Sequence, residues 1–136
     1  MSDNKTPRVG IGCWIFNQAG QVLLGLRLSP HGHDTWAAPG GKLEPGEEPA
    51  DCAARELSEE TGIIIPPEKF QFICFTNDIY PDAHYITLHY RVNNVTAVPH
   101  PMEPTKCAEW KWFDLNNLPN PLLLSAQKFI KLLPHR

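Results

Sequence analysis

Hydrophobic and polar positions alternate along much of the chain and predict strands separated by turns. Arg8–Phe16 and Gln21–Leu28 are rich in β-branched and aliphatic residues, and the turn residues between them predict a hairpin. The pattern then predicts a helix, two strands, a short strand and a closing amphipathic helix, at Pro49–Thr61, Lys69–Thr76, Ala83–Val92, Glu109–Phe113 and Leu122–Leu133. This order predicts an α/β (α+β) fold in which a mixed sheet is covered on both sides.

The predicted helix Pro49–Thr61 has clear signals at both ends. Pro49 suits a first helical turn, Asp51 places negative charge where the helix dipole favours it, and Gly62 suits a left-handed C-cap. One face of this helix carries carboxylates, at Glu56, Glu59 and Glu60. An acidic face is often only solvated, but the preceding glycine-rich loop and Arg55 favour a metal site here, and such hard oxygen ligands suit Mg²⁺.

Other polar positions leave alternatives open. Arg27, at the end of the second predicted strand, is either a surface charge or a contact to phosphate or base. His31 and His33 lack a third partner at suitable spacing, so a plain loop is predicted. In Ala83–Val92, the set containing Leu88 is expected to face the core, and Thr87 or His89 to face either a cleft or solvent. Trp36 is expected to serve in packing.

Composition narrows the class of protein. The 136 residues are 42% hydrophobic and 20% charged, which suits one globular domain, expected at 8–136 after a flexible tail at 1–7. A net charge of −3 gives no reason to expect stable nucleic-acid binding, and no apolar run is long enough to span a membrane. The widely spaced cysteines and the absence of a signal peptide predict reduced thiols in a cytoplasmic protein.

The stretch 41–63, GKLEPGEEPADCAARELSEETGI, follows the pattern G-x5-E-x7-R-E-U-x-E-E-x-G-U, where U is a bulky aliphatic residue. It resembles the Nudix box, the signature of hydrolases that cut nucleoside diphosphates linked to another group. Its specified positions are Gly41, Glu47, Arg55, Glu56, Leu57, Glu59, Glu60, Gly62 and Ile63. The resemblance implies an α/β/α sandwich with a loop-helix-loop catalytic motif beside the sheet.

The Nudix resemblance also implies roles for individual residues. Glu56, Glu59 and Glu60 would hold Mg²⁺, for which Mn²⁺ can substitute, with the backbone carbonyl of Gly40 as a further ligand. Glu56 or a downstream carboxylate would deprotonate the attacking water. Arg55 would orient the ligand carboxylates and Glu47 would hold Arg55.

Further segments, LLGLR, APGGKLEPGE, HYITL and EPTKCAEWKWFDLNNLP, resemble the MutT-type branch, which converts nucleoside triphosphates, including oxidised ones such as 8-oxo-dGTP, to monophosphates and pyrophosphate. Glu103 in EPTK is either an additional ligand or base, or an exposed loop charge. The candidate substrate-binding residues are Arg27, Gly40, Gly41 and Thr87. The expected partner is a small nucleotide, and a homodimer is compatible with the resemblance.

Two other functions remain open at this point. Tyr80 follows the box where dinucleoside-polyphosphate hydrolases place a tyrosine, which keeps that substrate class as the alternative. A non-catalytic nucleotide-binding module is less favoured, because such modules commonly lose a box carboxylate and this chain keeps all of them. The SQPWPFPxS element of the NADH-cleaving branch and a clear coenzyme A motif are absent from the sequence.

Overall fold

Strand β1 is the centre of the fold. The computed structural model describes residues 6–133, so most of the tail predicted at 1–7 lies outside the described residues. The strands and helices are β1 (Arg8–Asn17), β2 (Val22–Arg27), β3 (Trp36–Ala37), β4 (Gly40–Lys42), α1 (Pro49–Thr61), the 3-10 turn η1 (Pro67–Lys69), β5 (Gln71–Ile79), β6 (His84–Val95), β7 (Cys107–Phe113) and α2 (Leu124–Leu132). No helix within residues 6–133 is long and apolar enough to cross a bilayer.

The sheet is mixed and divides into two parts around β1. Strand β1 runs parallel to β6 and antiparallel to β4, and β5 pairs with the far side of β6. The predicted hairpin exists only at its tip, where Phe16 pairs with Val22. Beyond this point β1 is occupied by β4 and β6, so β2 turns away and pairs with β3 and β7.

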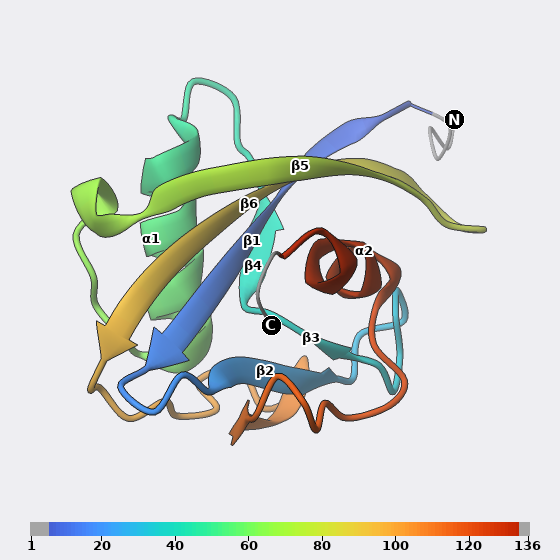
Figure 1. Ribbon diagram of the computed structural model, residues 1–136. Helices are drawn as coiled ribbons and strands as arrows, with labels where there is room; N and C mark the ends of the chain where they lie inside the picture. Colours follow the sequence, from blue (N-terminus) through green and yellow to red (C-terminus); the bar gives the residue numbers. More distant parts are fainter. Residues whose placement is uncertain (1–5, 134–136) are drawn as a thin grey trace.

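Helices α1 and α2 lie on opposite sides of the sheet formed by β4, β1, β6 and β5 (Figure 1). On one side, Leu57 of α1 packs with Ile11 and Ile15 of β1. On the other side, Phe129 of α2 packs with Trp14 of β1, with ring centroids 4.1 Å apart. Alternate residues of one strand therefore enter two separate cores, which confirms the predicted sandwich.

Helix α1 has the bounds that its end signals predict. Pro49 occupies the first turn, and Gly62 ends the helix with φ of 77° while its N–H bonds the Ser58 carbonyl. The bend into the following segment is thus made by a residue that adopts the left-handed conformation without a Cβ clash. This cap fixes the direction in which the carboxylates of the last two turns point.

Strand β5 corrects one prediction. Residues 77–79 were expected to belong to the connection between two strands, because Asn and Asp favour turns. Instead they continue β5, with Asn77 opposite Ile86 and Ile79 opposite His84. The backbone partners offered by the first half of β6 override the local preference, and this places Asp78 inside the protein, where it is fully buried.

Strand β6 is covered on both faces. Leu88 and Tyr90 pack against the core under α1, as predicted. Thr87 and His89 point to the other face and are only 8% and 1% exposed. Thr87 and His89 therefore do not face open solvent. Both line a cavity, which was the other predicted alternative.

Candidate active site

A cavity of about 700 Å³ lies beside α1 and is lined by residues from β1, β4, α1, β6 and α2. This volume is typical of a site for a small molecule. All of the candidate site residues except Glu47 line it, namely Arg27, Gly40, Gly41, Arg55, Glu56, Glu59, Glu60, Thr87 and Glu103. Arg27 and Glu103 therefore lie at the pocket, and their roles in binding substrate or metal stay predictions.

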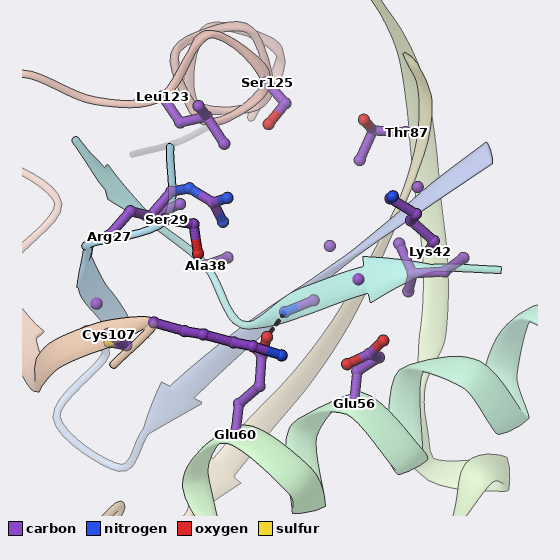
Figure 2. A pocket seen from close by; sticks show the side chains of 18 of the residues that line it. Arg27, Ser29, Ala38, Lys42, Glu56, Glu60, Thr87, Cys107, Leu123 and Ser125 are labelled. Carbon is purple, nitrogen blue, oxygen red and sulfur yellow. Dashed lines mark hydrogen bonds between the residues drawn. The ribbon is translucent and has the colours of Figure 1, made fainter. Parts of the chain in front are cut away.

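Glu56 and Glu60 project from α1 toward β4 (Figure 2). Glu60 Oε1 accepts a hydrogen bond of 2.9 Å from the Gly40 backbone N–H. The pKa of Glu56 is raised to about 7 and that of Glu60 to about 8, mainly by burial and to a smaller extent by neighbouring carboxylates such as Glu103. A cation beside these two partly buried carboxyls would favour their ionised forms.

Arg55 forms the contact with Glu47 that the box pattern predicts. Its Nε and Nη2 donate to the Glu47 carboxylate at 2.8 Å and 3.0 Å, while Nη1 donates to Glu59 at 3.1 Å. The Arg55 hydrogen bond lowers the pKa of Glu47 to about 2. Nη1 also lies 3.5 Å from Glu56. One guanidinium therefore joins the loop before α1 to the carboxylates on the helix face.

The donor set fits a divalent ion that also binds substrate. Among residues 6–133, no group of three His, Cys, Asp or Glu side chains is arranged to hold a metal ion by itself. Mg²⁺ commonly takes one or two protein carboxylates and completes its octahedron with water and substrate phosphates. The partly buried side chains of Glu56 and Glu60 provide two such carboxylates, whereas Glu59 is half exposed and forms an ion pair with Arg55.

Substitution of the two glycines of β4 is expected to have different effects, on stability at Gly40 and on the active site at Gly41. A Cβ added to Gly40 would overlap the backbone oxygen of Ile11, whereas a Cβ added to Gly41 would overlap the Glu56 carboxylate, a flexible side-chain end. We expect Gly41→Ala to fold and to lose activity by about 10²-fold, because the added methyl group would displace the Glu56 carboxylate, and disturbing the groups that orient a metal ligand has effects of this order. Thermal unfolding and turnover, measured on both variants, check this. Gly40→Ala should instead lower the melting temperature; a Gly41→Ala variant with native turnover would show that the position of Glu56 is unimportant.

Comparison with known proteins places these features in a family. The model of the NUDIX domain matches residues 6–133. The chain belongs to the Nudix family. RNA pyrophosphohydrolase of Bartonella bacilliformis is 30% identical over 146 residues, covering 88% of this chain and 86% of the relative. Oxidized purine nucleoside triphosphate hydrolase of Danio rerio is 30% identical over 132 residues, covering 83% of this chain and 78% of the relative.

Solved structures agree with the family assignment. The MutT NUDIX hydrolase from Burkholderia pseudomallei has a TM-score of 0.87 and 27% identity, covering 95% of this chain and 99% of the other. The NUDIX domain of Shewanella oneidensis NrtR, solved with ADP ribose, has a TM-score of 0.75 at 19% identity, covering 96% and 90%, and shares the fold. The protein is thus a MutT-like Nudix hydrolase acting on phosphorus-containing acid anhydrides, a class that in general uses divalent metals.

The Nudix pocket is also lined by His31, which the sequence did not single out as a pocket residue. His31 packs edge-on against Tyr80, with ring centroids 4.4 Å apart, and its Nδ1 lies 3.0 Å from a carboxylate oxygen of Asp82. Arg27 Nε donates to the His31 carbonyl at 3.0 Å, and Tyr80 accepts a hydrogen bond from the Ser125 backbone N–H. Tyr80 and Asp82 are far from His31 in sequence, so no local pattern could have revealed these contacts.

Proposed function

We propose that this Nudix hydrolase converts nucleoside triphosphates, including oxidised purine nucleotides such as 8-oxo-dGTP, to nucleoside monophosphate and pyrophosphate with Mg²⁺, or Mn²⁺ in its place. The observation that carries the proposal is the chemistry of the pocket lining. The partly buried carboxyls of Glu56 and Glu60 and the aromatic rings of Tyr80 and Tyr85 line the same cavity. The carboxyls suit a metal ion that binds phosphates, and the rings suit contact with a flat base.

The chemistry begins with the repulsion between a polyphosphate and its nucleophile. A bound divalent ion neutralises this charge and lowers the pKa of water. In the proposal, Glu56 and Glu60 hold the ion with the Gly40 carbonyl, and Glu59 and Glu103 contribute negative charge nearby. Arg55, held by Glu47, keeps the carboxylates on the helix in position.

Other pocket residues would bind the substrate phosphates and accept the proton of the attacking water. Arg27, Lys42 and Lys106 line the pocket and provide positive charge for phosphate oxygens. Water attacks a phosphorus atom, the bond from that phosphorus to the pyrophosphate oxygen breaks, and the water proton passes to a carboxylate. We assign this general-base role to Glu56, with Glu103 as the other carboxylate in reach of the pocket.

Two other substrate classes have support from specific observations. The relative from Bartonella bacilliformis is named an RNA pyrophosphohydrolase, which makes RNA with a 5′-triphosphate a candidate. Tyr80 lines the pocket, which keeps dinucleoside polyphosphates as a candidate. The family assignment and the complete box favour all of these hydrolytic functions over a non-catalytic binding module.

A substrate panel tests the proposal. With Mg²⁺ present, kcat/KM would be measured for the dNTPs, 8-oxo-dGTP, a dinucleoside polyphosphate, ADP-ribose, NADH and a short 5′-triphosphate RNA. We expect a nucleoside triphosphate to have the highest value. A higher value for the RNA or for the dinucleotide would replace the proposal with that substrate class. Sedimentation analysis of the same preparation would test the homodimer that we also propose.

A further inference from the structure

A buried chain of hydrogen bonds runs from β1 to the wall of the pocket. Trp14 Nε1 donates to His89 Nδ1 at 2.8 Å, and His89 Nε2 lies 2.8 Å from Thr76 Oγ1. Thr76 Oγ1 then donates to Asp78 Oδ2 at 2.9 Å, and Thr87 Oγ1 donates to the same oxygen at 2.7 Å. None of these five side chains belongs to the Nudix box, and each residue is less than a tenth exposed.

The direction of the first half of this chain is set by Trp14. An indole nitrogen can only donate, so Nδ1 of His89 must accept. Burial lowers the pKa of His89 to about 4, and the ring is therefore neutral at pH 7 with its proton on Nε2. That proton is donated to Thr76 Oγ1, whose own hydrogen is then directed to Asp78.

The direction of the second half is set by Asp78. Its carboxyl oxygens act as acceptors, and Lys128 Nζ lies 3.8 Å from Oδ1. Oδ2 receives the hydrogens of both threonines. A threonine hydroxyl has one hydrogen, and Thr87 has given it to Asp78. The lone pairs of Thr87 Oγ1 that remain can only accept a hydrogen bond.

A glycine on the neighbouring strand leaves space beside the Thr87 hydroxyl. A Cβ added to Gly10 would lie 3.5 Å from Thr87 Oγ1 and 3.5 Å from the Tyr85 ring, so its absence leaves this space open. Thr87, Gly10 and Tyr85 all line the cavity. Figure 2 shows Thr87 projecting from β6 toward the space below Leu123 and Ser125 of α2.

We propose that Thr87 is a specificity-determining residue that selects nucleotides whose base presents an N–H donor, and that Asp78 is the positioning residue that makes the Thr87 hydroxyl an acceptor. The assignment rests on the proposed function, since it takes a nucleotide as the ligand. A guanine or adenine base offers amino or ring N–H groups, whereas an unsubstituted purine offers none. A base without a donor leaves the Thr87 oxygen desolvated and unpaired, which is the kind of penalty that gives strong discrimination.

The test uses binding of monophosphates, which does not require turnover. Calorimetry would compare dGMP and dAMP with the monophosphate of unsubstituted purine deoxyriboside in the native protein, Thr87→Val and Thr87→Ser. We expect the native protein to bind the tighter of dGMP and dAMP about tenfold or more tightly than the purine deoxyriboside monophosphate. The difference is the cost of leaving one buried hydroxyl without a hydrogen-bond partner. Thr87→Val should lose this preference, and Thr87→Ser should keep it because its hydroxyl can make the same bond to Asp78.

Two further variants test separately whether the base needs open space beside the Thr87 hydroxyl and whether that hydroxyl must act as an acceptor. Gly10→Ala adds a methyl group at ordinary contact distance, so the protein should fold while the hydroxyl is covered and the preference falls. In Asp78→Asn, the side-chain amide can donate to Thr87, which frees the threonine hydrogen and should reverse the preference toward a base that accepts. A structural role alone would change affinity for all three bases equally.

The outcomes separate this assignment from the proposed function. Absence of any donor preference in the native protein, or its survival in Thr87→Val, would overturn the role of Thr87. A donor preference without release of pyrophosphate from triphosphates would support Thr87 and contradict the proposed reaction. If Asp78→Asn does not fold, the comparison of Thr87→Val with Thr87→Ser decides the question by itself.

Discussion

Replacing Glu56 with glutamine is expected to lower kcat by about 10³-fold, the middle of the range for loss of a general base. Glutamine keeps the shape of the side chain but carries neither the charge for a metal ion nor a basic oxygen. The Glu56 side chain is 16% exposed and sits against Gly41 at the pocket floor, so the change removes function with little room for structural rearrangement. Pyrophosphate release at saturating Mg²⁺ and substrate measures the effect.

Glu48→Gln is the matched control for Glu56→Gln. Glu48 is exposed at the N-cap of α1, and its side chain makes no capping hydrogen bond. The same chemical change there should leave kcat and the melting temperature near their native values. Equal losses in both variants would point to a general effect of charge on the helix, and a Glu56→Gln variant with native kcat would remove Glu56 from the mechanism.

The metal-free protein is expected to lose stability as the pH rises from about 6.5 to about 8.5. The pKa values of Glu56 and Glu60 are raised to about 7 and about 8, so in this range the folded state binds more protons than the unfolded state. The free energy of unfolding therefore falls with increasing pH, by up to about 1.4 kcal/mol per pH unit for each proton. His89 opposes this trend only near the lower end of the range, because its folded pKa is lowered to about 4, its unfolded pKa is about 6.5, and it is neutral in both states above about 7.5.

Urea unfolding in the presence of a chelator, at several pH values, measures this slope. Glu60→Gln should remove much of it and should stabilise the protein at the alkaline end. Mg²⁺ should stabilise the native protein more at pH 8.5 than at pH 6.5, because binding requires ionised carboxylates. A free energy of unfolding that does not change with pH in the native protein would contradict the burial of these two carboxyls as the source of the effect.

The features of the fold and site that depend on residues close in sequence could be predicted. The bounds of α1 follow from Pro49 and Gly62, and the helical period alone places Glu56 and Glu60 on one face. The contact between Arg55 and Glu47 follows from the box, in which a loop end and a helix turn are brought together by a short connection. These parts of the site lie within one continuous stretch, so the sequence contains them.

The features that could not be predicted depend on contacts between residues far apart in sequence. The extension of β5 through Asp78 depends on partners in β6 that no local pattern reveals, and it converts a residue expected in a turn into the buried end of a hydrogen-bond chain. Alternation along β6 showed that Thr87 and Leu88 face opposite ways, but which layer covers each face depends on where α2 packs. His31 likewise meets Tyr80 only in the folded chain.

The identity of the products tests the central claim most directly. Native protein would be incubated with Mg²⁺ and a dNTP, and the phosphorus-containing products would be resolved by ³¹P NMR. The proposed function predicts equal amounts of nucleoside monophosphate and pyrophosphate. Nucleoside diphosphate with inorganic phosphate, or no reaction while RNA or dinucleotide substrates are cleaved, would contradict it.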